Sequence, residues 1–183
     1  MTRRQIIMTA AVGTVGLAAL VGLAGYYGRP REDDDDDDEG GGQEALSRAL
    51  LSTNVNLQQG LAASEELGQP IAGKFELQHR KFQLFVYTSN DGKFSEVLVD
   101  PVTGKVARVE ALTRADELAT AQSQSAAMVS AKTSLKAAVD KASAQAVGFQ
   151  PVGIIPNLKD GRPVATVLLL KGEQSRLVNV ALD

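Results

Sequence analysis

Two segments of this 183-residue chain alternate apolar with polar residues between tight turns, and this period of two excludes an all-helical fold. In the first segment, Asn90-Asp91-Gly92 has residues that tolerate the positive φ angles of a hairpin turn, and Asp100–Lys105 turns the chain again. The strands are expected at Lys74–Leu77, Lys81–Thr88, Lys93–Val99 and Val106–Glu110. The pattern therefore predicts a three- or four-stranded antiparallel meander.

The second segment repeats this order of strands and turns. Its turns are predicted at Asn157–Pro163, which contains Asp160-Gly161, and at Gly172-Glu173. The strands are expected at Gln150–Pro156, Val164–Lys171 and Ser175–Leu182. Residues 164–170 are largely apolar on both faces, which is typical of a strand that is covered on both sides. We therefore expect two sheets, or one sheet and a neighbouring helix, to pack together.

Helical sequence precedes the first set of strands. Glu44–Leu51 reads as a short helix, and a second helix begins at Asn56, whose side chain can cap it while Gln59 reaches back. Gly68 and Pro70 end this second helix, because one favours a left-handed cap and the other cannot continue the helix.

A longer helical stretch separates the two sets of strands. Thr113 is its expected cap, and Ala-rich sequence continues to Ala146. The polar run Ser123–Ser125 is the predicted break, so we expect a helix pair or one bent helix.

The turn at 100–105 has a physical reason for its composition. Asp100 can accept backbone N–H groups, Pro101 fixes φ, and Gly104 adopts the left-handed conformation. This favours a structural role over a second interpretation, in which Asp100 and Lys105 form a charged recognition pair.

The order helix, strand, strand with Asp-Gly-Lys at its turn, strand, and then Asp-x-x-Thr-Gly-Lys-Val resembles the PepSY domain over roughly Val55–Val109. The turn residues that carry this resemblance are Asp91, Gly92, Lys93, Asp100, Thr103, Gly104 and Lys105. The resemblance implies an α+β fold of two tandem small modules, each a helix packed on a three- to four-stranded antiparallel β-meander, forming one compact pair. The first module spans 44–112, and a second, divergent copy spans 113–183.

The N-terminal residues 1–28 predict export. Arg3-Arg4 precedes the uncharged apolar stretch Ile6–Tyr27, which is either a signal peptide, with a possible cut after Ala24, or a membrane anchor. The paired arginines are compatible with the twin-arginine route as well as the general secretory route. Either interpretation places the protein in the periplasm or on the outer face of the inner membrane.

Residues 29–43 read as a disordered acidic and glycine-rich spacer. Asp33–Asp38 concentrates like charges that repel one another in a compact structure, and Gly40–Gly42 adds backbone freedom. A calcium loop starting at Asp35 would have Gly40 at its sixth position but Leu46 at its twelfth, where a glutamate is needed. Loose association with divalent cations stays open as an alternative.

Composition and motifs argue against most enzyme classes. Residues 44–183 carry nearly equal numbers of acidic and basic side chains, so no basic surface for nucleic acid is expected. The chain has no cysteine, and its single histidine, His79, has no second histidine for a metal site. No nucleophile elbow or nucleotide-binding motif is present, and Glu76, Glu96 and Glu110 read as parts of a solvated sheet face. We expect no enzymatic activity, no cofactor and no metal site.

The resemblance implies a binding or regulatory role. PepSY domains occur in propeptides of secreted metallopeptidases and are thought to modulate peptidases, so a protein or peptide partner is expected, with an envelope peptidase as a candidate. An exposed sheet edge offers a way to hold such a partner by strand addition. The alternative is a membrane-tethered structural or adaptor protein whose acidic run is a spacer, in contact with the membrane only through residues 6–27. The oligomeric state does not follow from the sequence.

Overall fold

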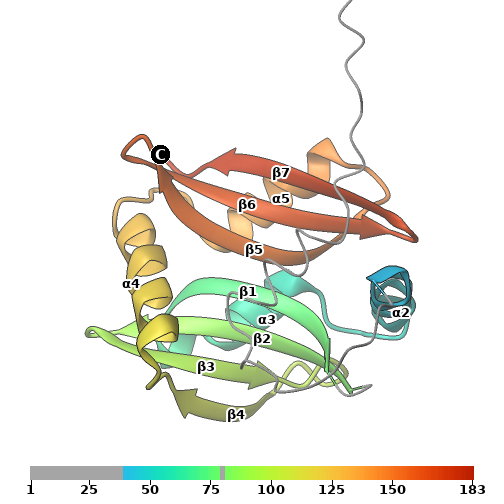
Figure 1. The fold of residues 1–183 in the computed structure, drawn as a ribbon, viewed down its shortest axis with the longest axis horizontal. Helices are drawn as coiled ribbons and strands as arrows, with labels where there is room; N and C mark the ends of the chain where they lie inside the picture. The colour runs from blue at the N-terminus through green and yellow to red at the C-terminus, as the bar shows by residue number, and fades with distance from the viewer. Residues whose placement is uncertain (1–38, 79–80) are drawn as a thin grey trace, which may run out of the picture.

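The computed structural model describes residues 39–78 and 81–183 and shows an α+β fold (Figure 1). Seven strands form one antiparallel sheet in the order β4-β3-β2-β1-β5-β6-β7. The strands are β1 (Gln69–Gln78), β2 (Lys81–Asn90), β3 (Lys93–Val99), β4 (Val106–Ala111), β5 (Gln150–Lys159), β6 (Arg162–Lys171) and β7 (Gln174–Ala181). The predicted α+β class with antiparallel meanders is therefore confirmed. The predictions for the apolar segment at 1–28, for residues 29–38 and for His79 lie outside the described residues.

The two meanders meet edge to edge, because β1 pairs with β5 through Gly73 opposite Ile154 and Lys74 opposite Gly153. Of the two arrangements expected from the apolar strand at 164–170, the stacking of two sheets is not found, because the two meanders form one continuous sheet. Pairing over these two residue pairs joins two strands that would otherwise be free edges. Leu168 and Leu169 point to opposite faces of β6 and are both buried, so the strand is covered twice as predicted.

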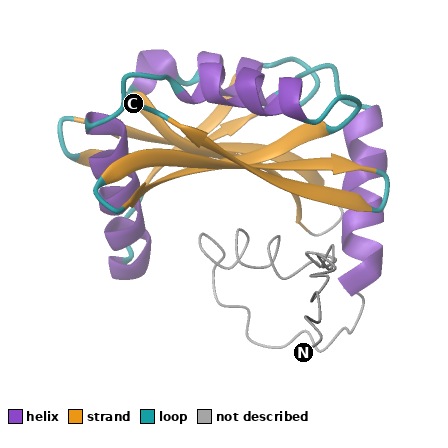
Figure 2. Cartoon of the chain, turned by 90° about the horizontal axis from the view of Figure 1, so that it is seen from above, coloured by secondary structure: helices purple, strands orange, loops and turns teal. Residues whose placement is uncertain are grey.

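The helices cover one face and both ends of this sheet (Figures 1 and 2). They are α2 (Glu39–Leu51), α3 (Leu57–Ala63), α4 (Ala115–Val129) and α5 (Leu135–Gln145), with a 3-10 turn η1 (Glu65–Leu67). The helices α3 and α5 contact each other and lie along one face, and Gln58 Nε2 of α3 donates to Asp140 Oδ1 of α5 at 3.0 Å. The helices α2 and α4 stand at opposite ends of the strands.

The packing of α3 on the sheet requires two glycines. A Cβ atom at Gly60 would lie 2.3 Å from Cδ2 of Leu84, and one at Gly73 would lie 3.1 Å from Cδ2 of Leu61. Both leucines are fully buried. The core therefore lies between the helix pair and the sheet, and it defines which face each strand residue occupies.

Helix α2 begins earlier than predicted. Its first residue is Glu39, so the part of the expected disordered spacer at 39–43 is helical. Gln43 Nε2 donates to the carbonyl of Glu173 at 2.8 Å, and Leu46 and Leu50 are buried. Tertiary contacts of the second and third turns thus stabilise a helix that its glycines disfavour.

The helix pair between the two meanders is confirmed, but its break is displaced. The helices separate at Ser130–Ser134 and not at Ser123–Ser125, because Gln124 is buried on α4 and Ser134 caps α5 by accepting from Ala137 N at 3.2 Å. The cap position of α4 is Arg114 and not Thr113. Serine and threonine are poor guides to a boundary when several follow one another.

Candidate functional site

The predicted turn residues Asp91, Gly92 and Lys93 form the tip of the β2–β3 hairpin. Asp91 has φ 49° and Gly92 has φ 74°, and Lys93 pairs with Asn90 across the turn. These angles are those of the tight turn that the sequence predicts. All three residues are exposed, and the geometry accounts for their composition through the backbone alone.

The predicted turn at Asp100–Lys105 closes on its own backbone. Asp100 Oδ1 accepts from the N–H of Thr103 at 2.7 Å, from the N–H of Val102 at 3.0 Å and from Thr103 Oγ1 at 3.0 Å. These hydrogen bonds, that of the Thr103 N–H first, hold the pKa of Asp100 below its ordinary value. Gly104 has φ 70°, and Lys105 O accepts from Asp100 N at 2.9 Å.

The two predicted turns are not brought together. They lie at opposite ends of β3, whose seven residues separate them by about 20 Å at ~3.3 Å per residue. The carboxylate of Asp100 is directed into its own turn, which favours the structural role over the charged recognition pair.

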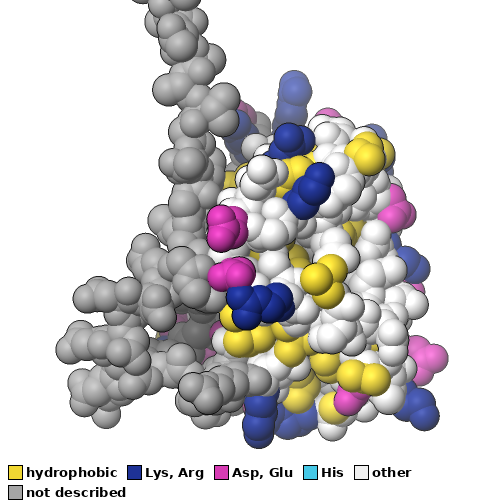
Figure 3. Space-filling model, turned by 90° about the vertical axis from the view of Figure 1, so that its right-hand side faces the viewer, with side chains coloured by type: hydrophobic (Ala, Val, Ile, Leu, Met, Phe, Trp, Pro, Cys, Tyr) yellow, Lys and Arg dark blue, Asp and Glu magenta, His cyan; other side chains and the backbone are white. Residues whose placement is uncertain are grey.

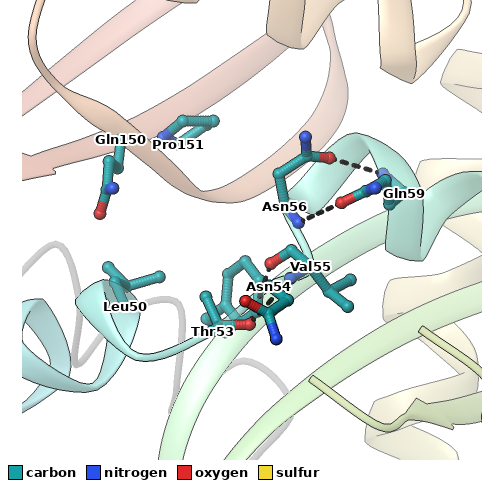
Figure 4. A pocket seen from close by; sticks show the side chains of 9 residues that line it. Leu50, Thr53, Asn54, Val55, Asn56, Gln59, Gln150 and Pro151 are labelled. Atoms are coloured by element: carbon teal, nitrogen blue, oxygen red, sulfur yellow. Dashed lines mark hydrogen bonds between the residues drawn. The ribbon is translucent and has the colours of Figure 1, made fainter. Parts of the chain in front are cut away.

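Two hollows lie where α2 meets the ends of the central strands. The first, of about 170 Å³, is lined by Leu50, Thr53, Asn54, Val55, Asn56, Gln59, Phe75, Gln150 and Pro151 (Figure 4). In it, Asn56 and Gln59 are occupied by the predicted capping box at 2.8 Å in each direction. The volume is below the ~300–1,000 Å³ of ordinary small-molecule sites.

The second hollow, of about 350 Å³, lies on the other side of α2 against the turn between β6 and β7. Its polar groups are used within the fold, because Ser47 Oγ donates to the carbonyl of Gly172 at 2.7 Å and Arg48 pairs with Glu44. The Ser47 contact docks α2 on the turn between β6 and β7, whereas the Arg48–Glu44 pair lies within the helix. Neither hollow presents a nucleophile with a hydrogen-bonded base among the described residues.

Two acids that are far apart in the sequence, Glu96 and Glu110, are aligned with Tyr87 by the sheet register on the face opposite α3. Tyr87 pairs with Glu96, and Glu96 with Glu110, so their side chains stand in one row across β2, β3 and β4. Tyr87 Oη donates to Glu96 Oε2 at 2.9 Å, and Arg108 lies 4.0 Å from Glu96 Oε1 and 3.4 Å from Glu110 Oε1. Only the register, which alternation alone does not give, reveals this row.

Burial raises the pKa of Glu96 above its ordinary value, and desolvation is the largest cause. The hydrogen bond from Tyr87 and the nearby cations Lys74 and Arg108 act in the opposite direction. Lys74 itself contacts Glu76 at 2.6 Å on this face. The row is a hydrogen-bonded, charge-paired network, and residues 39–78 and 81–183 contain no group of acids, histidines or cysteines suited to a metal ion.

Strands β4 and β7 are the two edge strands of the sheet. All six residues of β4 are exposed, with Val106 38% and Val109 45% accessible. On β7, Leu177 is 40% accessible. No described strand lies beyond either one (Figure 1).

The other described surfaces are less suited to binding a partner. The end of the molecule that faces the viewer in Figure 3 shows hydrophobic side chains in several groups separated by charged and polar atoms. Among the helices that the structure describes, none has the length and apolar character needed to cross a membrane. The free edges of the sheet are therefore the candidate functional site.

Comparisons with known proteins give no family. No family model matches the chain, and no curated protein matches it. Among solved structures it is similar to a proposed lipoprotein of Clostridium difficile 630, at 14% identity and a TM-score of 0.40, over 66% of this chain and 80% of the other. A likeness at that level indicates neither a family nor a function.

Proposed function

We propose that this chain is a non-catalytic binding or regulatory protein of the bacterial envelope, built from two tandem PepSY-like modules. The observation that carries the proposal is the pair of free sheet edges, β4 and β7. An edge strand binds an extended segment of a partner by continuing the hydrogen-bonded ladder, and its exposed side chains set the preference. An envelope peptidase is the partner class that the PepSY resemblance favours.

The arrangement of elements supports two modules. In each half a helix on the same face precedes a meander of at least three strands, α3 before β1–β4 and α5 before β5–β7. The central pairs β1–β5 and α3–α5 are those that two copies related by a two-fold axis would form. The β2–β3 and β5–β6 hairpins both turn on an Asp-Gly pair with positive φ, Asp91-Gly92 and Asp160-Gly161. The β6–β7 hairpin turns on Gly172, which also has positive φ.

Export rests on the sequence of residues 1–28. The uncharged stretch Ile6–Tyr27 after Arg3-Arg4 supports a periplasmic protein or one held at the outer face of the inner membrane. The same 22 residues also favour a second candidate function, a tethered adaptor with the acidic run as spacer, since as a helix they would extend about 33 Å. Intact mass in each cell fraction separates the two: the adaptor requires the full 19.3 kDa in membranes.

Site-specific photocrosslinking tests the edges directly. A photoreactive amino acid is placed at Leu177 on β7 or Val109 on β4 in cells that export the full chain, with Val129, 79% accessible at the end of α4, as the matched control. The proposal expects adducts with another envelope protein from at least one edge position and none from position 129. Equal adducts from all three positions, or none from either edge, would contradict it.

A further inference from the structure

The sequence of edge strand β4 is complementary to itself. In β4, Arg108 precedes Val109 and Glu110 follows it. Reversing the direction of the strand therefore exchanges the positions of the positive and the negative side chain. Alanine and valine make up the rest of the strand. Two copies of β4 running antiparallel about Val109 would therefore place each arginine opposite a glutamate.

The backbone geometry permits this pairing. Leu112 N donates to Phe94 O at 2.9 Å, so Leu112 turns its backbone groups toward β3. In an antiparallel ladder this orientation alternates, so Glu110 and Arg108 also bond toward β3, whereas Ala111 and Val109 turn their N–H and C=O groups to the free edge. Val109 opposite Val109 of a second copy is therefore a hydrogen-bonded pair.

Electrostatics selects one register among the neighbouring ones. Moving the two-fold axis by one residue toward the N-terminus sets Arg108 opposite its own copy, and moving it toward the C-terminus does the same for Glu110. Like charges directly opposite are destabilising. The side chains of Arg108 and Glu110 are about half exposed, so both are accessible to a second strand at this edge.

The sequence of β7 and the bulge in β4 also favour a symmetric pair centred on Val109. Strand β7 carries Arg176 as its only charged residue, so a symmetric β7 pair has no acid to match it. On β4 the register shift beside Leu98 leaves Ala107 unpaired and ends the regular edge there. The regular part of the edge, residues 108–111, thus contains the self-complementary residues 108–110.

From this complementarity we infer that β4 pairs with β4 of a second copy of this chain, with Val109 on the two-fold axis and Arg108 of each copy opposite Glu110 of the other. The pairing joins two seven-stranded sheets across their β4 edges and leaves β7 free at each outer end. It does not depend on the partner-binding function, and it leaves β7 as the edge on which a different protein can add a strand.

Single-cysteine crosslinking tests the pairing in the full chain, which has no cysteine of its own. In the inferred register the Cα atoms of two Val109→Cys residues are about 5.5 Å apart, within disulfide range. Ala111→Cys is the matched control, because two copies of residue 111 are offset by four residues and about 14 Å. Mild oxidation of envelope fractions should give a band at twice the monomer mass with Val109→Cys and at most a tenth as much with Ala111→Cys.

Charge exchange tests the register. In the Val109→Cys background, Arg108→Glu opposes two pairs of like charges and should weaken dimerisation about tenfold. Adding Glu110→Arg restores opposite charges across the axis and should restore the dimer band, which a general loss of folding would not do. Equal crosslinking of the two cysteine variants, or dimer formation that is insensitive to Arg108→Glu, overturns the inference; adducts with other proteins in place of the dimer also overturn it.

Discussion

Replacing Gly68 with alanine should be among the most destabilising single changes at a turn of this protein. Gly68 links η1 to β1 with φ 153° and ψ 176°, a conformation almost restricted to glycine. A Cβ atom there would lie 2.7 Å from the carbonyl oxygen of Ser89, which is backbone of the β1–β2 ladder opposite Gln69. Because this oxygen belongs to the backbone, it cannot rotate away as the end of a side chain could.

The expected loss can be estimated from these two terms. Backbone strain of this kind costs about 1–3 kcal/mol, and relief of the contact requires the first pair of the ladder to separate, so we expect a total near 3 kcal/mol. Gly161→Ala is the matched control, since Gly161 has φ 74° and no atom within 4 Å of the added Cβ. That change carries only the left-handed penalty of about 1 kcal/mol.

Urea unfolding of the full-length chain, followed by far-ultraviolet circular dichroism, measures both variants against the parent. At equal m values the midpoint should fall about three times as far for Gly68→Ala as for Gly161→Ala. Equal losses would refute the reasoning, because they would mean that the close approach to Ser89 adds nothing.

Further predictions concern the core, a cap and two carboxylates. Leu84→Ala, at a fully buried side chain that contacts Gly60, should cost about 3 kcal/mol in the same unfolding assay; a loss below 1 kcal/mol would contradict the core assignment. Asn56→Ala, which removes the capping box of α3, should cost about 1 kcal/mol. The pKa of Asp100 is lowered in the fold, so Asp100→Asn should reduce stability at neutral pH, and the difference from the parent should shrink as pH falls through and below the ordinary aspartate range near 3.8. The pKa of Glu96 is raised, so its protonated form is favoured in the fold: Glu96→Gln should match the parent near pH 4 and exceed it in stability as pH rises above 4.5, and the opposite trend would show that its ion pairs outweigh its burial.

Local signals predicted local structure well. The Asn56 cap, the Asp91-Gly92 turn and the Asp100 turn depend on residues within a few positions of one another, and all three are found as predicted. Strand β3 has the predicted bounds for the same reason, since a strong turn limits it at each end.

Contacts between distant residues could not be read from the chain. The β1–β5 pairing joins residues about eighty positions apart, and nothing in either strand marks it. The early start of α2 depends on the Glu173 carbonyl, and the late break between α4 and α5 depends on the burial of Gln124. The Tyr87–Glu96–Glu110 row likewise required the register of three strands.

Capture of partners from envelope extract by edge variants tests the central proposal most directly. Leu182 N donates to Pro163 O at 2.9 Å, so the backbone N–H of Leu182 points toward β6. Because this direction alternates along the strand, the N–H of Leu177 points away from β6. Leu177→Pro therefore blocks strand addition without removing a hydrogen bond of the existing ladder. Leu177→Ala keeps the N–H group and is its control. The full-length chain and Leu177→Ala should enrich the same envelope protein, and Leu177→Pro should lose it. Undiminished capture by Leu177→Pro would contradict binding at the free edge of β7.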